Sequence, residues 1–472
     1  DVLAETYLNY KPVSIETLIG KKGKNQLSMA DLEPEAISDY AAEDADITLQ
    51  LKKAFEKDMK EEHLSKLFHE MELPLMRVLA TMELEGVNLD ISALKEYSVK
   101  LGSLIDQLEK EIHELADEEF NVDSPKQLGV ILFEKLAISA KAKKTKTGQY
   151  STGEDVLTKH INDHEIVPKL MKYRQLRKLK STYVDPLPDL VNENTNRLHT
   201  NYMQTIAATG RLSSNNPNLQ NIPIRTEEGR YIRKAFIPRD ENHILLAADY
   251  SQVELRIIAA LSEDDAMCEA FINGADIHAA TASKVFGVPI EEVDREMRSK
   301  AKAVNFGIIY GQGAFGLAQN LGISRKESKG IIDEYYVQFS KLKEYQNQNI
   351  EFARKNGYVE TILGRRRYLK DINSSNAVVR GFAERNAINA PIQGSAADVI
   401  KVAMVNLQKI FMEKKFKSKM IMQVHDELVF DAHKDEVEMI KPIIKAEMES
   451  AVKLRVPLEV EIDMGENWLE AH

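Results

Sequence analysis

Two stretches of the sequence place acidic side chains at the end of an apolar strand pattern. Ile244–Ala248 are apolar and run directly into Asp249. The largely apolar run Met420–Val424 leads to His425-Asp426-Glu427, and a further apolar run follows. The second pattern predicts a β-hairpin with three polar residues at its tip. Carboxylates held at strand ends are the oxygen ligands that Mg²⁺ prefers, so we expect the two aspartates to meet as a metal site.

A third pattern has cations and aromatics recurring every four residues, at Arg298, Lys302, Phe306 and Tyr310. This spacing places the four side chains in one slowly drifting stripe along a helix. The cationic end suits the phosphates of a nucleoside triphosphate, and the aromatic end suits its base and sugar. An amphipathic helix with its aromatics in the core is the alternative interpretation.

Composition sets the outer bounds. A chain of 472 residues with 43% hydrophobic and 29% charged residues predicts a globular protein of about three domains. We find no apolar run long enough to span a membrane and no signal peptide. A single cysteine, Cys268, excludes an internal disulfide and favours a reducing compartment.

The net charge of −11 argues against a nucleic-acid partner only if its distribution is ignored. Positive charge is concentrated in Lys135–Lys146, Lys169–Lys180 and Arg365–Lys370. Solvated helix faces would explain any one of these clusters. Together they favour a channel for a phosphate backbone.

The elements that must position these residues are mixed in type. Glu61–Glu118 has a helical pattern that contains the long amphipathic stretch Leu101–Ala116, and Ile166–Tyr183 predicts a second, basic helix. Lys141–Gly153 is polar and predicts a mobile loop. Helical patterns also fill Ser251–Lys355. The layout is α+β: a helical N-terminal half, an antiparallel sheet that carries the acids, and a helical insertion between the parts of the sheet.

Further motifs accompany these patterns: A-T-G-R-L-S-S at Ala208–Ser214, N-P-N-L-Q-N-I-P at Asn216–Pro223, E-R-x-A-I-N-A-P-I-Q-G at Glu384–Gly394, and a final G-E-N-W. With D-Y-S-Q-V-E-L-R, the striped helix and Q-V-H-D-E-L-V-F, they follow the order seen in the family A DNA polymerases. The chain resembles this family, and within it the large fragment of the bacterial DNA polymerase I group.

The resemblance implies a right-hand architecture with an antiparallel palm sheet and helical fingers and thumb. By position, residues 63–190 would form the thumb, 191–262 and 379–472 the palm, and 263–378 the fingers. Residues 1–62 would be a remnant of a 3′–5′ exonuclease domain. Tyr40 and Asp44 match the last motif of that domain, whose other acids would precede Asp1, so we expect its catalytic site to be incomplete.

The resemblance also implies a reaction: template-directed addition of deoxynucleotides to a primer 3′-hydroxyl, in DNA replication and repair. Asp249, Asp426 and the backbone carbonyl of Tyr250 would hold two Mg²⁺ ions, one activating the hydroxyl and the other stabilising pyrophosphate. Glu427 would belong to the catalytic site, beside the metal ligands or as an exposed acid. We expect a monomer that acts on primer–template DNA and deoxynucleoside triphosphates in the bacterial cytoplasm, at the nucleoid and away from membranes.

The same resemblance assigns the remaining roles. Lys302, and Arg298 beside it, would act on the departing pyrophosphate, with Lys302 as general acid. The residues expected to bind the incoming nucleotide are Gln252, Glu254, His278, Arg298, Lys302, Phe306 and Tyr310. The residues expected to contact the duplex are Arg211, Asn218, Gln220, Arg385, Asn389 and Gln393, with His425 at the primer terminus.

Several alternatives stay open at this point. Ser251 and Glu254 have the spacing of a helix capping box, which would make Glu254 a structural residue rather than the gate that excludes a ribose 2′-hydroxyl. Asn218 and Asn389 could be turn or helix caps. A catalytically weak DNA-binding relative would be expected to lack one of the two aspartates, and both are present. A nuclease would use the same carboxylates but would not explain the striped helix.

Overall fold

The computed structural model describes residues 1–224 and 226–472. Its centre is a four-stranded sheet with the order β10-β11-β7-β12 and antiparallel pairing throughout. These strands are β7 (His243–Tyr250), β10 (Lys419–Val424), β11 (Glu427–His433) and β12 (Val460–Gly465). The predicted hairpin is confirmed as β10–β11, and its polar tip lies next to the end of β7. We call this the palm sheet.

The palm sheet supports two hydrophobic cores, one on each face. Successive side chains of a strand point to opposite faces, so Leu246 and Ala248 enter one core while Leu245 and Ala247 enter the other. The first core also takes in the helical insertion and the helix Leu73–Glu85, and the second takes in the helices between residues 91 and 189. Burial on both faces explains why the strand ending at Asp249 is an almost unbroken apolar run.

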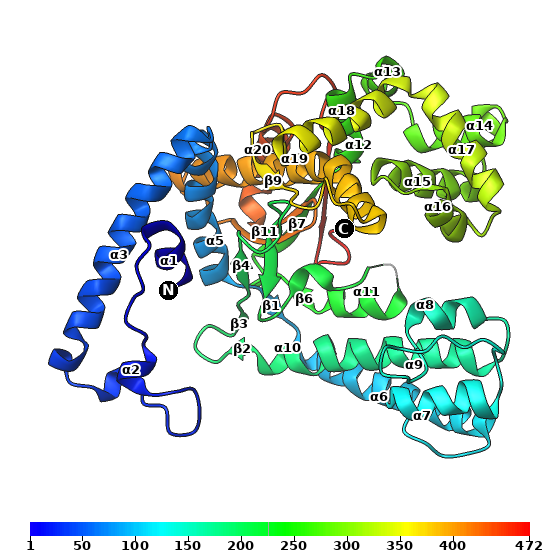
Figure 1. Cartoon of the computed structure of the whole chain (residues 1–472), viewed down its shortest axis with the longest axis horizontal. Helices are drawn as coiled ribbons and strands as arrows, with labels where there is room; N and C mark the ends of the chain where they lie inside the picture. Colours follow the sequence, from blue (N-terminus) through cyan, green and yellow to red (C-terminus); the bar gives the residue numbers. More distant parts are fainter. Residues whose placement is uncertain (225) are drawn as a thin grey trace.

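The helical insertion forms the upper right lobe of Figure 1, the fingers. Helix α15 contains the predicted stripe, and α14 packs against α15. Helix α18 returns to the palm and packs against α12 and α19. Helix α12 (Val253–Ser262) connects the palm sheet to this region, whose helices are α13 (Asp265–Ile272), α14 (Ile277–Phe286), α15 (Arg295–Ile309), α16 (Ala314–Leu321), α17 (Arg325–Gln338) and α18 (Ser340–Asn356).

A second helical lobe, the thumb, lies at the lower right of Figure 1. The predicted amphipathic stretch is part of α6, whose apolar face packs against α9 and whose start is capped by the Asp90 side chain, 2.9 Å from the amide of Ala93. The helices of this lobe are α6 (Ile91–Ala116), α7 (Pro125–Val130), α8 (Glu154–Leu157), α9 (Ile166–Leu179) and α10 (Pro186–Asp189).

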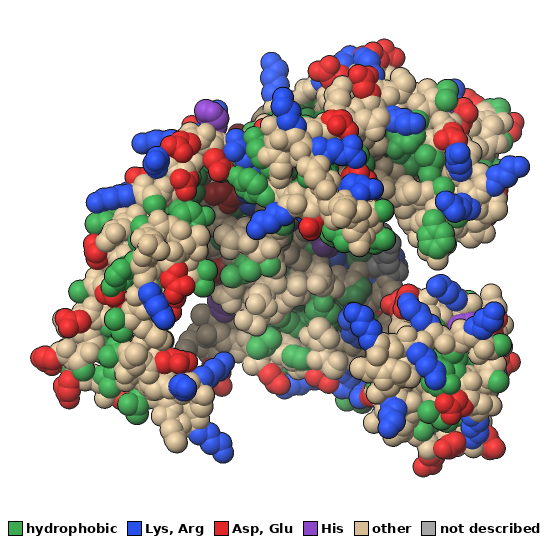
Figure 2. All heavy atoms as spheres, in the orientation of Figure 1, with side chains coloured by type: hydrophobic (Ala, Val, Ile, Leu, Met, Phe, Trp, Pro, Cys, Tyr) green, Lys and Arg blue, Asp and Glu red, His purple; other side chains and the backbone are tan. Residues whose placement is uncertain are grey.

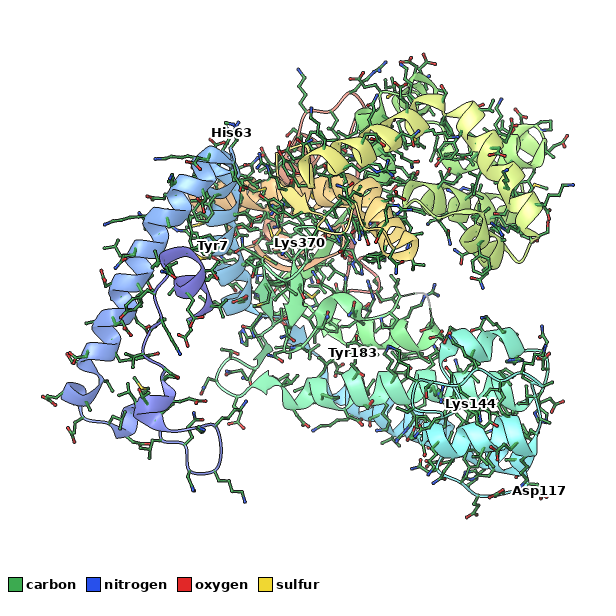
Figure 3. The ribbon with its side chains drawn as sticks, viewed as in Figure 1. Tyr7, His63, Asp117, Lys144, Tyr183 and Lys370 are labelled. Carbon is green, nitrogen blue, oxygen red and sulfur yellow. The ribbon has the colours of Figure 1, made fainter. Side chains whose placement is uncertain are left out.

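Between the fingers and the thumb the molecule is open, and Figure 2 shows many Lys and Arg side chains along the rim of the thumb. Lys144 lies in the thumb lobe and Lys370 lies close to the palm (Figure 3). The basic segment Lys141–Gly153 is irregular apart from a bridge between Lys144 and Tyr150, where the ammonium group lies 4.6 Å from the ring centroid. The third basic cluster is held by internal acids instead: Arg365 pairs with Glu72 and Asp398, and Arg366 pairs with Glu62 and Glu360. A phosphate-backbone channel along the opening therefore stays a prediction.

The N-terminal segment runs along the left edge of Figure 1 as α1 (Val2–Leu8), α2 (Glu16–Ile19) and the long α3 (Pro34–Glu61). A π-helical turn, Phe68–Glu72, leads into α5 (Leu73–Glu85), which reaches the palm. The other elements are α11 (Glu227–Lys234), α19 (Ala377–Glu413), α20 (Val437–Glu449) and the small antiparallel pairs β1 (Asn88–Leu89) with β6 (Phe236–Ile237), β2 (Val191–Asn192) with β3 (Arg197–Leu198), β4 (Asn201–Met203) with β5 (Ser213–Asn215), and β8 (Tyr358–Glu360) with β9 (Arg366–Tyr368).

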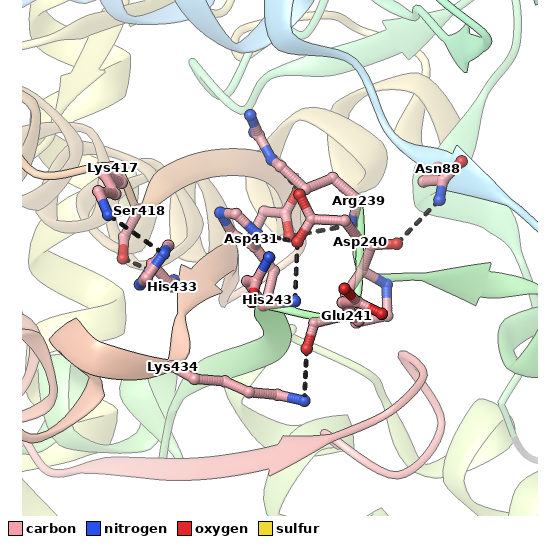
Figure 4. A network of polar contacts seen from close by, with 12 residues as sticks. Asn88, Arg239, Asp240, Glu241, His243, Lys417, Ser418, Asp431, His433 and Lys434 are labelled. Carbon is pink, nitrogen blue, oxygen red and sulfur yellow. Dashed lines mark hydrogen bonds and ion pairs between the residues drawn. The ribbon is translucent and has the colours of Figure 1, made fainter.

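A polar network anchors the end of the palm sheet that lies away from Asp249 (Figure 4). The fully buried Asp431 accepts from Nε of Arg239 at 2.8 Å and from Nη2 of Arg197 at 3.2 Å. Arg239 also contacts Glu85 of α5 at 3.0 Å. Two guanidinium groups offset the cost of burying this carboxylate, so the network ties α5 to the sheet. No helix among the described residues combines the length and hydropathy that crossing a membrane requires.

Candidate active site

The predicted acids meet at one end of the palm sheet. Asp249 and Glu427 are directly opposed across β7 and β11. Asp426 lies in the hairpin turn, and the amide of Tyr250 donates to its carbonyl oxygen at 3.2 Å. The turn is tight because His425 adopts a left-handed conformation with φ of 55°. The pairing of distant strands thus brings the two aspartates together, as the sequence predicts.

The electrostatics of this site fit a divalent cation. Burial, together with the like charges of Glu427 and Asp426, raises the pKa of Asp249 to about 7. Burial also raises the pKa of Asp426. A divalent cation between them would relieve this repulsion. In the described part of the chain no set of three or more His, Cys, Asp and Glu side chains forms a metal cluster, so a cation here would need oxygen ligands from outside such side chains.

Glu427 differs from its aspartate neighbours because its carboxylate already has partners. The side chain is buried, and Nε1 of Trp468 donates to Oε1 at 2.8 Å. Nδ1 of His472 lies 3.0 Å from Oε2. Both oxygens are therefore engaged by the segment that follows β12. Of the expected catalytic acids, Asp249 and Asp426 are the ones left available to a cation.

The capping-box interpretation of Glu254 is wrong. Helix α12 begins after Gln252, which is left-handed with φ of 55° and makes no side-chain cap. The amide of Ser251 donates instead to the carbonyl of Glu459, 2.9 Å away on the approach to β12. The chain turns sharply as it leaves the strand, so Ser251 does not occupy the cap position that its spacing from Glu254 suggested.

Glu254 instead joins two other motifs in the interior of the site. Its Oε1 accepts from Nη2 of Arg211 at 2.6 Å, and its other oxygen accepts from the hydroxyl of Tyr310. Burial raises the pKa of Glu254, against the opposing effects of these two partners. Arg211 follows Gly210, where φ is +82° and a Cβ would come within 2.4 Å of Nε of Arg365. Glycine is therefore required to bring Arg211 to Glu254.

The stripe is confirmed as one continuous helix: α15 carries Arg298, Lys302 and Phe306 and ends at Ile309, and Tyr310 follows as its C-cap. Nε of Arg298 lies 2.5 Å from Oδ2 of Asp276, and Lys302 is exposed. The rings of Phe306 and Tyr310 have centroids 6.0 Å apart and are tilted by 33°. Both rings pack against the core and stay partly exposed, so the core interpretation holds in part.

His278 lies beside this stripe, with its ring centroid 6.0 Å from that of Phe306. The ring is buried, and Nδ1 contacts the side-chain amide of Asn305 at 2.9 Å. Burial lowers the pKa of His278 to about 4, with Arg298 and Lys302 acting in the same direction and Asp276 opposing them. The imidazole is therefore neutral at physiological pH.

The residues expected to contact DNA fall into two groups. Arg211, Gln220 and His425 line one pocket at the end of the palm sheet, together with the expected metal ligand Asp426. Nε2 of Gln220 donates to Oε1 of Gln423 at 2.9 Å, which holds the loop before α11 against the hairpin.

Arg385, Asn389 and Gln393 instead lie on α19. Asn218 caps a short 3₁₀ turn through its contact with the amide of Gln220 at 3.0 Å, so its capping interpretation is confirmed. Asn389 lies in the interior of α19, and its buried Oδ1 has no hydrogen-bond partner among the described residues. The same is true of Oε1 of Gln252. An unpartnered buried acceptor is costly and is expected where a ligand supplies the donor.

Sequence reasoning missed the residues that hold these groups in place. Asp276 fixes Arg298, Asn305 fixes His278, and Trp468 with His472 fixes Glu427. Asp276 carried a usable signal, since an aspartate two residues before His278 is typical of a helix N-cap, and here it caps α14. Trp468 belongs to the G-E-N-W motif, but nothing local in that motif indicates its partner.

The chain is similar to known proteins along most of its length. The model of DNA polymerase family A matches residues 91–470. The chain is 45% identical to DNA polymerase I of Bacillus subtilis over 97% of its length and 51% of that protein. It is 47% identical to DNA polymerase I of Pseudomonas aeruginosa, over 100% of its length and 52% of that protein. The chain thus spans about half the length of these curated relatives.

Among solved structures, the chain is similar to one described as the POL domain of Pol1 from M. smegmatis in complex with DNA primer-template and dNTP. The TM-score is 0.89 at 40% sequence identity, covering 100% of this chain and 79% of the other. The expected architecture of palm, fingers and thumb is therefore confirmed.

Proposed function

The chain belongs to DNA polymerase family A, and on this premise we propose that it is a template-directed DNA polymerase of replication and repair. The reaction would add deoxynucleotides to the 3′-hydroxyl of a primer. The observation that carries the proposal is the meeting of Asp249 and Asp426 at one end of the palm sheet, two partly buried carboxylates whose mutual repulsion a divalent cation would relieve.

Asp249, Asp426 and the backbone carbonyl of Tyr250 would hold the Mg²⁺ ions. When bound, the ions lower the pKa of the attacking hydroxyl and stabilise the charge that develops on the phosphates. The sheet supplies rigidity, because each aspartate directly adjoins a strand that is buried on both faces.

The incoming nucleotide would lie along α15. Arg298 and Lys302 would bind its phosphates through charge-assisted hydrogen bonds, and Lys302 would give a proton to the departing pyrophosphate. Phe306 and Tyr310 would stack on the base and sugar. Glu254 would fill the space beside C2′ of the sugar, where the hydrogen bonds from Arg211 and Tyr310 hold it.

The DNA partner would be a primer–template duplex. The solved structure similar to this chain is described as a complex with DNA primer-template and dNTP, which supports this choice. Arg, Asn and Gln side chains on α19 and in the loop before α11 can bond the minor-groove acceptors that all correct base pairs share. Such contacts would sense pair geometry without reading sequence. We further propose that the protein acts as a monomer in the bacterial cytoplasm, at the nucleoid.

Primer extension tests the proposal. Asp249→Asn and Asp426→Asn each remove one anionic ligand at nearly constant volume, so each variant should lose nucleotide incorporation while retaining its thermal stability and its affinity for the duplex. Asp463→Asn is the matched control, because Asp463 is exposed on the neighbouring strand β12. Extension by either site variant at the parent rate would show that these aspartates are not the catalytic ligands.

A further inference from the structure

The segment Gly465–His472, which we call the C-terminal turn, folds back onto the catalytic end of the palm sheet. The amide of Trp468 donates to the carbonyl of Phe236 at 2.9 Å, and the amide of Ala471 donates to that of Asn467 at 3.1 Å. A Cβ on Gly465 would lie 2.3 Å from Cβ of Glu470, so the fold-back is close. These contacts fix the C-terminal turn against the palm sheet and the residues beside it.

Trp468 is the anchor of the C-terminal turn. It is completely buried, with the guanidinium carbon of Arg233 3.9 Å from its ring centroid and the ring of Phe236 edge-on at 5.4 Å. Arg233 belongs to α11, and its Nη2 donates to the carbonyl of Ile222 at 3.2 Å. The indole is thus fixed between α11 and the sheet, which leaves its N–H aimed at Glu427.

The register of the palm sheet explains why Glu427 needs to be held. Directly opposed residues in an antiparallel pair place their side chains on the same face, so Glu427 and Asp249 share a face. That face is the one on which Trp468 packs. Without a partner, the Glu427 carboxylate would stand beside Asp249 as a third anionic ligand for any cation bound there.

We propose that Trp468 and His472 are positioning residues that hold Glu427 away from the cations and so present Asp249 and Asp426 alone to them. The indole N–H and the imidazole occupy the two oxygens of Glu427. Partners of this kind around a metal site orient the ligands and set the charge of the site. The kinetic consequence rests on the proposed polymerase function, whereas the consequence for cation binding does not.

Two variants test the proposal. Trp468→Phe keeps an aromatic ring, although a smaller one, and removes the N–H, and His472→Ala removes the imidazole from a partly exposed position. Each should free the Glu427 carboxylate, which can then act as a further anionic ligand beside Asp249. We expect Mn²⁺, followed by electron paramagnetic resonance on the DNA-free protein, to bind about threefold to tenfold more tightly. The kcat for primer extension should fall by roughly 10-fold or more, with the KM for nucleotide and the duplex Kd within about twofold of the parent.

Three controls make the test specific. His472→Gln retains a side-chain donor and should restore parent behaviour. In a Glu427→Gln background, Trp468→Phe should no longer tighten Mn²⁺ binding, because the charge that it would free is absent. Tyr335→Phe removes a buried hydroxyl that has no partner among the described residues, and it should match the parent in every measurement.

The proposal is overturned if Mn²⁺ affinity and kcat stay within about twofold of the parent in both variants. It is also overturned if the effect of Trp468→Phe persists in the Glu427→Gln background, which would indicate a purely structural role. A parent protein that binds Mn²⁺ but does not extend a primer would instead contradict the polymerase function, and the Mn²⁺ measurements would still test the role of the turn.

Discussion

The side chain of Glu254 is buried and shared between Arg211 and Tyr310. A nucleotide with a 2′-hydroxyl would clash with it or leave a polar group poorly paired. Glu254→Ala should therefore raise ribonucleotide incorporation relative to deoxyribonucleotide by well over tenfold in competition assays. Glu269→Ala, an exposed acid on α13, is the control. Unchanged sugar discrimination would show that Glu254 only fixes Arg211 and Tyr310.

His278 should make the free energy of unfolding depend on pH. Its pKa is lowered by burial to about 4 from an ordinary value of 6.5, so the unfolded chain takes up a proton at higher pH than the folded chain does. The contribution of His278 to the free energy of unfolding is therefore fully present above pH 6.5, and it is lost as the pH falls toward 4. At about pH 5 the free energy of unfolding should be lower by about 2 kcal/mol because of this one group.

Thermal unfolding at pH 7.5 and at pH 5 checks this prediction. His278→Gln should show a smaller drop in melting temperature between the two conditions than the parent does. His69→Gln changes an exposed histidine and should follow the parent. An equal drop in all three proteins would assign the acid sensitivity to other groups.

At the scale of elements, the cationic side chains of α15 differ in whether they pair, among the described residues, with an acid of another helix, with an acid of the same helix, or with none. Arg298 is fixed by Asp276 at the start of α14, and Lys302 is exposed. Lys300 instead pairs with Glu296 one turn earlier in the same helix. Arg298→Ala and Lys302→Ala should each lower kcat/KM for nucleotide by roughly ten- to 150-fold, the effect of one charge-assisted hydrogen bond, with little change in duplex affinity.

Lys300→Ala is the matched control on α15, and it should change kcat/KM by less than about twofold because an exposed ion pair within a helix contributes little. Single-nucleotide incorporation and duplex binding would be measured on all three variants. If the alanine variants lose duplex affinity instead of nucleotide use, the stripe belongs to the channel for the phosphate backbone.

At the scale of the whole molecule, the N-terminal segment stays a predicted remnant of an exonuclease domain. Asp44 is exposed on α3, and Tyr40 lies one turn before it. We predict that the 472-residue chain does not shorten labelled single-stranded DNA in the presence of Mg²⁺, because one exposed acid cannot hold a cation pair by itself. Asp44→Asn should leave the result unchanged. Degradation that this substitution removes would place a working nuclease site on α3.

Much of the architecture could be predicted because it depends on local patterns of apolar and polar residues along the sequence. The apolar run before Asp249, the hairpin around Asp426 and the four-residue stripe of α15 each correspond to a strand or a helix in the structure. Periodicity determines which face of an element is apolar, and the cores form on those faces. Motif order supplied the family, and with it the expectation that these elements converge.

The tertiary structure alone decided which side chains pair. Local spacing made Glu254 a capping residue, but the left-handed turn at Gln252 removed that role and long-range packing gave it Arg211 and Tyr310. Glu427 likewise has partners in Trp468 and His472 that no local pattern indicates. The sequence by itself determined the elements and the chemical groups they carry, because these depend on neighbours within a few residues. Hydrogen-bond partners distant in sequence depend on how complete elements pack, and only the folded chain determines that.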